Sequence, residues 1–294
     1  MILHFFKKFK DIIINQVNMQ NLKSNSIQMY DLGQVIGRGG FAVVRRAKCR
    51  TTDENVAIKI IDKEKMIKLG MTERVHNEIN IHLSLPPHGR IARAYTSFED
   101  DCNFYLVLEL CPLGNFFNYL RSKIRLNENI AKNIISQLLE SLRHLHSYNI
   151  VHRDLKLSNI LLSELESESN NLKNDDDMKI NVKLCDFGLA VHTGHPDEEH
   201  YTLCGTPNYI APEIAARSSH STPADLWSIG CLFYCMLVGR PPFEEQQKTA
   251  SASAGHVRYH DHGKGSGLNS AAVEKTFDRI KTGTYVIPDD VSIS

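Results

Sequence analysis

The sequence predicts an α+β fold with two unequal lobes, and three observations carry that prediction. Short apolar strand patterns crowd the chain between residues 30 and 110. Beyond residue 111, apolar residues recur mostly at helical spacing. The 294 residues suffice for one large domain of two lobes or for two small domains. Because strands come first and helices follow, we expect a strand-rich lobe over residues 30–110 and a helical lobe over residues 112–294.

The first lobe is predicted from four strands and one helix. The strand patterns cover residues 32–36, 42–47, 56–61 and 104–110, and the helical pattern covers residues 72–85. Pro112 and Gly114 end the last strand. This order places a glycine-rich turn between the first two strands.

The second lobe opens with a long amphipathic helix over residues 130–146. Two later stretches have the composition of solvated insertions. Residues 163–181 carry six acidic residues against two lysines, and residues 246–272 are rich in Ser, Gly, Ala and His. We expect both to be poorly ordered loops, although the histidines of the second (His256, His260 and His262) leave a metal site as a minor alternative.

The chain begins with a segment of different character. Residues 1–14 place apolar side chains on one helical face and lysines elsewhere, so they could touch a membrane surface. We favour a flexible N-terminal extension over residues 1–29. No apolar run is long enough to span a bilayer. A formal net charge of zero gives no reason to expect nucleic acid as a partner.

Seven cysteines form no CxxC pair. Their pattern favours reduced thiols inside a cell rather than a disulfide framework or a zinc site. We therefore expect a cytoplasmic protein.

The glycine-rich turn is the first candidate binding element. Glycines between two strands let backbone N–H groups approach a polyanion such as a triphosphate. A glycine hairpin without a ligand is an equally good interpretation of this turn alone. The residues concerned are Ile36, Gly37, Arg38, Gly39, Gly40, Phe41, Ala42, Val43 and Val44.

A lysine at the end of an apolar strand is the second candidate. Lys59 ends the run Val56-Ala57-Ile58-Lys59, where an ammonium needs an anionic partner. Glu78, in the middle of the next helix, is the expected carboxylate, with Glu73 as the fallback. A surface lysine is the alternative.

Three further motifs follow in a fixed order. They are His152-Arg153-Asp154-Leu155-Lys156-Leu157-Ser158-Asn159, then Asp186-Phe187-Gly188, then Ala211-Pro212-Glu213. With these motifs the chain resembles the eukaryotic protein kinases from Tyr30 to about Phe243 and again from near Lys275. The resemblance implies a bilobal protein kinase fold that transfers the γ-phosphate of ATP to Ser or Thr hydroxyls of protein substrates.

The resemblance also implies a role for each residue. Asp154 accepts the proton of the substrate hydroxyl, Lys156 neutralises charge on the transferred phosphate, and Asn159 and Asp186 hold Mg²⁺. Lys59 holds the α- and β-phosphates and Glu78 holds Lys59. The adenine pocket is implied at Ala57, Leu108, Glu109, Cys111 and Leu161.

The segment from Asp186 to Glu213 is implied to be an activation loop. It contains five hydroxyl side chains: Thr193, Tyr201, Thr202, Thr206 and Tyr209. Thr202 is the expected activating phosphosite, with Arg153 as the receiver of its phosphate. The alternative is that Thr202 is an ordinary loop hydroxyl.

Five stretches narrow the resemblance further. Tyr201-Thr202-Leu203-Cys204-Gly205-Thr206-Pro207 and Leu108-Glu109-Leu110-Cys111 look like the polo-like kinases. Within that group, three other stretches look most like the Sak/polo-like kinase 4 branch: His144-Leu145-His146-Ser147-Tyr148-Asn149-Ile150, Arg217-Ser218-Ser219-His220 and Val238-Gly239-Arg240-Pro241-Pro242-Phe243-Glu244. That branch implies action at centrosomes, in centriole duplication and the cell cycle, with self-association for trans-autophosphorylation.

The sequence departs from that branch at its end. It lacks the polo boxes and stops before the last helices expected of the second lobe. We expect a truncated helical lobe, which keeps a catalytically impaired nucleotide-binding scaffold as the alternative function.

Overall fold

The computed structural model describes residues 26–167, 178–194, 201–219, 221–244, 270–289 and 291. The chain divides into two compact units. Unit 1 comprises Met1–Ser84 and Arg93–Leu110, and unit 2 comprises Leu85–Ala92 and Cys111–Ser294. The division after residue 110 falls where the strand and helix patterns change. The short segment Leu85–Ala92, expected in the first lobe, belongs instead to unit 2.

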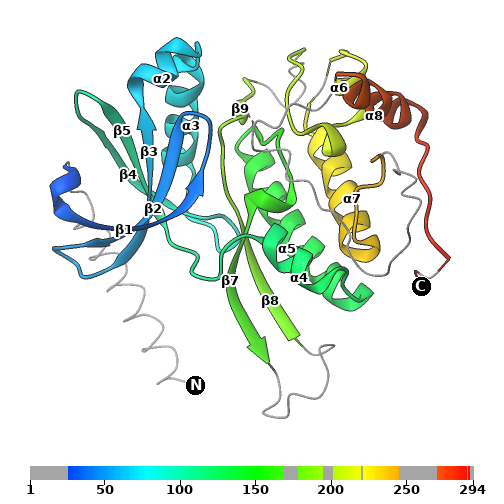
Figure 1. Cartoon of the computed structure of the whole chain (residues 1–294), viewed down its shortest axis with the longest axis horizontal. Coiled ribbons are helices and arrows are strands. Elements are labelled where there is room, and N and C mark those ends of the chain that lie inside the picture. Colours follow the sequence, from blue (N-terminus) through cyan, green and yellow to red (C-terminus); the bar gives the residue numbers. More distant parts are fainter. Residues whose placement is uncertain are drawn as a thin grey trace. The chain divides into compact units, whose positions relative to one another are not determined.

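Unit 1 is built on a five-stranded antiparallel sheet in the order β1-β2-β3-β5-β4 (Figure 1). The strands are β1 (Tyr30–Arg38), β2 (Ala42–Cys49), β3 (Asn55–Asp62), β4 (Ala94–Glu99) and β5 (Asn103–Glu109). A short 3₁₀ helix, η1 (Ile27–Met29), precedes them, and the helices α2 (Lys63–Lys68) and α3 (Thr72–Ser84) follow β3. The sequence pattern therefore located four of the five strands and missed β4 and α2.

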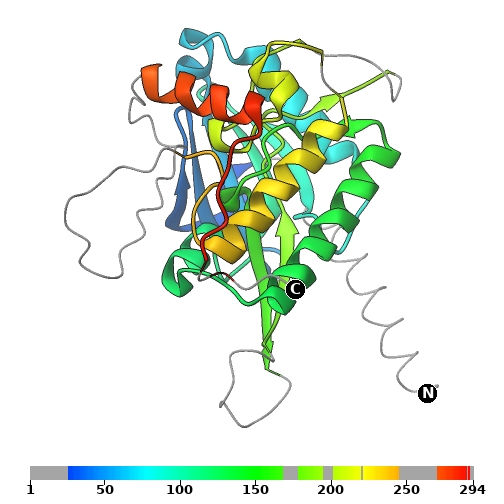
Figure 2. The same ribbon diagram turned by 90° about the vertical axis from the view of Figure 1, so that its right-hand side faces the viewer.

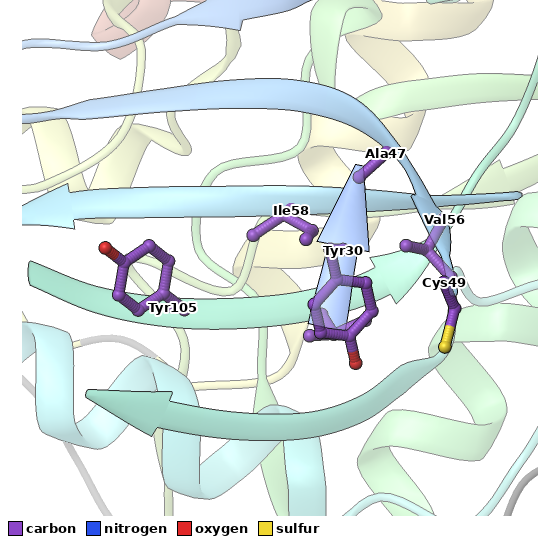
Figure 3. Close-up of a cluster of buried hydrophobic side chains, with 7 residues drawn as sticks. Tyr30, Ala47, Cys49, Val56, Ile58 and Tyr105 are labelled. Carbon is purple, nitrogen blue, oxygen red and sulfur yellow. The ribbon is translucent and has the colours of Figure 1, made fainter. Parts of the chain in front are cut away.

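The two faces of this sheet have different neighbours. Strand residues alternate between faces, so each register pair shares one face. On one face, a core of Tyr30, Ala47, Val56, Ile58 and Tyr105 is buried, together with Cys49 and Val107 (Figure 3). On the other face, apolar side chains of α2 and α3 pack on Ala42 and Ile61. The second face also carries Lys59, which α3 can therefore reach.

The start of the fold lies earlier than predicted. Ser26 caps η1 through a hydrogen bond from the Gln28 N–H to its Oγ, at 3.3 Å. Ile27 and Met29 pack against the buried core of the sheet. Residues 26–29 therefore belong to the folded unit rather than to the extension, of which residues 1–25 lie outside the described residues.

Unit 2 is mostly helical. Its helices are α4 (Phe116–Lys123), α5 (Glu128–Ser147), α6 (Pro212–Ala215), α7 (Pro223–Val238) and α8 (Ser270–Thr282), with the 3₁₀ turns η2 (Leu157–Asn159) and η4 (Pro207–Tyr209). Helices α5 and α7 lie side by side (Figure 2). Asn127 begins α5 by accepting the Ile130 N–H, and Gly239 ends α7 in a left-handed conformation.

Two small antiparallel sheets complete unit 2: β6 (Ile150–Val151) with β9 (Val191–His192), and β7 (Ile160–Ser167) with β8 (Met178–Leu184). The second pair extends into the stretch 163–181 that was expected to be a loop. Ile180 is buried, and Gln137 of α5 binds the backbone on either side of Asn181. The predicted loop was therefore too wide, and only residues 168–177 of it lie outside the described residues. The second predicted loop likewise ends before residue 272, because α8 begins at Ser270.

Candidate active site

The predicted lysine and carboxylate meet in unit 1. Lys59 lies on β3, opposite Val44 of β2 and Leu106 of β5. Its Nζ forms a hydrogen-bonded ion pair with Oε1 of Glu78, which α3 supplies. Glu78 is 3% exposed, so the carboxylate is withdrawn from water and needs a cation beside it. The expected partner Glu78 is confirmed, and the fallback Glu73 lies on an exposed part of α3.

The glycine-rich turn has an open backbone. The Gly39 N–H donates to the Ala42 carbonyl at 2.8 Å and closes the hairpin between β1 and β2. Neither Gly39 nor Gly40 has a positive φ, and a Cβ on Gly40 would meet nothing within 4 Å. The turn itself therefore does not require glycine at residue 40. What the missing side chains provide is access to the backbone, as a bound phosphate would need.

The predicted adenine-contacting residues fall in both units. In unit 1, Ala57 and Leu108 are register partners on β3 and β5 and share a face with Lys59. The Glu109 N–H donates to the Arg93 carbonyl at 2.8 Å, so a backbone contact from Glu109 would have to come from its carbonyl. In unit 2, Cys111 is buried and Leu161 lies on β7, where it pairs with Asn115.

Asp154 is the centre of the polar cluster in unit 2. Its Oδ2 accepts from Lys156 Nζ at 2.7 Å and from Asn159 Nδ2 at 3.2 Å, and its Oδ1 accepts from Thr206 Oγ1 at 2.8 Å. A carboxylate offers about four lone-pair sites. Three are used, which leaves one on Oδ1 for a further hydroxyl donor. The structure thus brings Asp154, Lys156 and Asn159 together as predicted and adds Thr206.

A buried carboxylate holds the backbone before Asp154. Asp225, at the start of α7, is fully buried and accepts the N–H groups of His152 and Arg153 at 3.0 and 2.9 Å. It also contacts His146 Nε2 at 2.9 Å. Arg153 has φ +63°, a conformation that a non-glycine residue adopts at a cost. Asp225 offsets that cost. Asp225 was not among the residues predicted from the sequence, in which only its place in the first turn of a buried helix distinguishes it.

The two predicted metal ligands lie on adjacent backbone. The Cys185 N–H donates to the Asn159 carbonyl at 2.9 Å, and Asp186 follows directly with φ +65°. Because Asn159 Nδ2 faces Asp154, its side-chain oxygen is turned away and can serve as a ligand. One carboxylate and one amide oxygen fit a divalent cation that draws its remaining ligands from phosphate and water. No group of three His, Cys, Asp or Glu suited to a metal occurs in the described part of the chain.

The predicted activation loop approaches Asp154 closely. A Cβ on Gly205, whose φ is +100°, would lie 2.9 Å from the Arg153 carbonyl, so only glycine fits there. This close approach allows the next residue, Thr206, to reach the Asp154 carboxylate. Sequence reasoning named Thr206 only as one hydroxyl among five. Its position after an obligatory glycine was the signal for its role.

The five loop hydroxyls differ in accessibility. Thr193 is fully buried and donates to the Asn149 carbonyl at 3.1 Å, and Tyr209 is 9% exposed. Thr206 is occupied with Asp154. Tyr201 and Thr202 are exposed. Arg153, the expected receiver of a phosphate, donates from Nε to the Leu189 carbonyl at 2.8 Å.

Three further observations concern the Glu213 side chain, the helices and the histidine-rich stretch. In the described ranges, the Glu213 side chain forms no ion pair. None of the helices in the described residues combines the length and apolar character needed to cross a bilayer. The histidines of residues 246–272 lie outside the described residues.

Comparisons with known proteins place the chain in a family. The protein kinase domain model matches residues 30–272. The serine/threonine-protein kinase PLK4 of Drosophila yakuba is 46% identical over 268 residues, which are 91% of this chain and 30% of the relative. Those of Aedes aegypti and Nematostella vectensis are 45% and 42% identical over 75% and 92% of this chain, and 27% and 24% of the relatives.

The chain thus spans less than a third of the length of these relatives. The resemblance to the polo-like kinase 4 branch is confirmed by these similarities. Protein kinase domains in general use ATP and a divalent metal. With the motifs, the α+β architecture and the match over most of its length, the chain belongs to the protein kinase domain family.

Proposed function

We propose that this chain is a Ser/Thr protein kinase that transfers the γ-phosphate of ATP to hydroxyls of protein substrates. The observation that carries the proposal is the Asp154 carboxylate, oriented by Lys156, Asn159 and Thr206 with one lone-pair site left on Oδ1. A carboxylate so placed can orient a substrate hydroxyl and take its proton. The hydroxyl oxygen then bonds to the γ-phosphorus, the bond from that phosphorus to the β–γ bridging oxygen breaks, and ADP leaves.

The remaining residues act by electrostatics. Lys156, whose Nζ has further N–H donors, is proposed to neutralise charge on the transferred phosphoryl oxygens. Lys59 is proposed to hold the α- and β-phosphates, with Glu78 fixing its direction. Asp186 and the Asn159 side-chain oxygen would hold Mg²⁺, which would offset the negative charge of the phosphates. The glycine turn over residues 37–40 would cover the phosphates, and Leu108, Cys111 and Leu161 would contact adenine.

Replacing Lys59 by methionine tests whether its ammonium takes part in the reaction. The variant loses the ammonium that meets Glu78 and, as proposed, the phosphates. We expect weaker ATP binding and a turnover lowered by about 10²-fold, the scale seen when one electrostatic contact to reacting phosphates or oxyanions is removed.

Binding is measured by isothermal titration with an ATP analogue, and turnover by transfer of labelled phosphate to a protein substrate. The exposed Lys68, which pairs with Glu64 on α2, gives the matched control Lys68→Met. Unchanged kinetics in Lys59→Met would show that Lys59 has no part in the reaction.

We further propose that phosphorylation of Thr202 activates the kinase. Thr202 is exposed and precedes Gly205 and Thr206, which contact the backbone and side chain of the Arg153–Asp154 pair. A phosphate adds a charge of about −1.5 to −2 and can form charge-assisted hydrogen bonds with a guanidinium. The guanidinium of Arg153 uses Nε for Leu189 and has further N–H donors.

Thr202→Ala should therefore lower turnover several-fold, and Thr202→Asp should restore part of it. Phosphate-transfer rates of the purified variants decide the matter, with neighbouring Tyr201→Phe as the control. Equal rates in all of them would remove Thr202 as a switch.

The cellular role is proposed from the relatives alone. We propose action in centriole duplication at the centrosome, in the cytoplasm, with self-association for trans-autophosphorylation. A tagged full-length protein that never coincides with a centriolar marker would contradict this role without affecting the proposed chemistry.

A further inference from the structure

The segment Leu85–Ala92 is fastened to unit 2 from two sides. Toward β8, the Leu184 N–H donates to the Arg90 carbonyl and the Ala92 N–H donates to the Leu184 carbonyl, both at 2.9 Å. The Arg90 guanidinium adds a bond from Nη1 to Asn181 Oδ1 at 3.0 Å. Toward α5, the rings of His88 and His144 are stacked with centroids 4.5 Å apart and planes 21° apart, and Arg90 Nε lies 3.5 Å from Glu140 Oε2.

The hydrogen bonds of the two rings show which ring nitrogens carry a proton. His144 Nε2 lies 3.1 Å from the Pro86 carbonyl, which can only accept, so Nε2 carries a proton. His88 Nδ1 accepts the Arg90 N–H at 3.2 Å, so Nδ1 carries none. A second proton on His144 would leave its bond to Pro86 intact. A second proton on His88 would place an N–H against the N–H of Arg90 and break that bond.

We propose that the His88–His144 pair is an acid-sensitive clamp, which holds the segment Leu85–Ala92 on α5 most firmly while His88 is neutral and loosens when His88 is protonated. Two imidazolium rings stacked at 4.5 Å would also repel each other. Protonation of His88 therefore removes one hydrogen bond, and protonation of both rings makes the ring contact repulsive.

The charged groups around His88 come from both elements that meet there. Arg90 lies on its own segment, and α5 supplies Glu140, Arg143 and His144. The ring of Tyr148, the residue directly after α5, has its centroid 5.1 Å from that of His144. Glu140 favours the charged form of His88, and it is partly neutralised by Arg90 Nε at 3.5 Å. Burial is the largest cause that lowers the pKa of His88 below its ordinary value of 6.5, and the positive groups lower it further.

The direction of the pH effect follows from that lowered pKa. The folded protein binds a proton at His88 less readily than the unfolded chain does. The clamp therefore contributes its full stability above pH about 6.5 and loses it as the pH falls from there through the lowered folded-state pKa.

The segment is connected to elements that carry two of the residues proposed to serve the reaction. Leu85–Ala92 follows directly on α3, which carries Glu78, and it bonds to Leu184, two residues before Asp186. Loosening this segment acts on the backbone next to two of the residues proposed to serve the reaction. The clamp itself does not depend on the proposed function, because its test measures protonation and stability.

The experiment is an NMR titration of the whole chain with ¹³C-labelled histidine, combined with thermal unfolding at about pH 7.5 and about pH 5.5. We expect the His88 ring to titrate below the ordinary value, and the Arg90 amide signal to move with the same midpoint. In His144→Phe, which keeps a stacked ring without its charge, the His88 midpoint should rise.

Thermal unfolding supplies the second measurement. His88→Asn keeps an acceptor for the Arg90 N–H but cannot be protonated, so it should lose less melting temperature on acidification than the wild type. The exposed His192 on β9 provides the matched control His192→Asn, which should behave as the wild type does.

A His88 midpoint at or above the ordinary value would overturn the clamp, as would equal acid sensitivity of His88→Asn and the wild type. Should His88→Asn fail to fold, the titrations of the wild type and His144→Phe decide the question on their own.

Discussion

Replacing Asp154 by alanine is expected to lower phosphoryl-transfer turnover by about 10²–10⁴-fold, the usual effect of losing a general base. The carboxylate is the one group of the unit 2 cluster that can both orient a hydroxyl and accept its proton. Lys156, Asn159 and Thr206 all donate to it, so its removal also frees the groups that it holds in place. The fold should survive, since the buried Asp154 side chain is bonded to polar groups and is not part of the apolar core.

The experiment compares turnover and ATP binding for the wild type, Asp154→Ala and Asp154→Asn. Asparagine keeps the shape of the side chain but has no basic carboxylate, so both variants should lose activity to a similar degree while still binding ATP. Asp154→Asn with wild-type turnover would mean that the reaction needs no base at this position. Loss of ATP binding in both variants would instead indicate that Asp154 mainly supports the nucleotide site.

Replacing Asp225 by alanine is expected to lower the free energy of unfolding by about 2–5 kcal/mol. The side chain is fully buried and accepts the N–H groups of His152 and Arg153. Each buried donor left without a partner costs about 1–3 kcal/mol. Against a typical total stability of about 5–15 kcal/mol, this loss is severe. Turnover should fall as well, because the freed backbone carries Asp154.

Urea unfolding of the purified variant measures the effect. Asp225→Asn should recover only part of the stability, since one of its two polar atoms is a donor facing N–H groups. Asp278 on α8 is largely exposed and approaches Lys281 only at 3.7 Å, so Asp278→Ala serves as the control and should change stability little. An Asp225→Ala protein as stable as this control would contradict the role assigned to the buried carboxylate.

Much of the fold and several site residues could be predicted because their signals are local. The run Val56-Ala57-Ile58-Lys59 could be recognised locally, because an ammonium that follows apolar residues needs an anionic partner. The helix over Glu128–Ser147 has apolar side chains at every turn and an Asn cap at its start. The order of the motifs around Asp154 and Asp186 then pointed to a protein kinase.

The parts that could not be predicted depend on contacts between distant residues. Asp225 binds the backbone of Arg153 from 72 positions away along the chain, and Thr206 binds Asp154 from 52 positions away. No sequence pattern near Asp225 indicates its contact. The part of β7 and β8 within residues 163–181 looked like a loop because Glu164 and Glu166 lie in β7 and acidic residues precede β8 in the sequence. Gln137 of α5, whose side chain binds two β8 backbone groups, extends the pairing there. The placement of Leu85–Ala92 in unit 2 rests on backbone bonds to Leu184 in the same way.

One measurement tests the central claim most directly. The purified chain is incubated with Mg²⁺, γ-labelled ATP and a mixed protein substrate, and the labelled residues are identified by mass spectrometry. The account predicts phosphoserine and phosphothreonine that disappear in Asp154→Ala. Bound ATP without any labelled hydroxyl, or label that persists in Asp154→Ala, would contradict it.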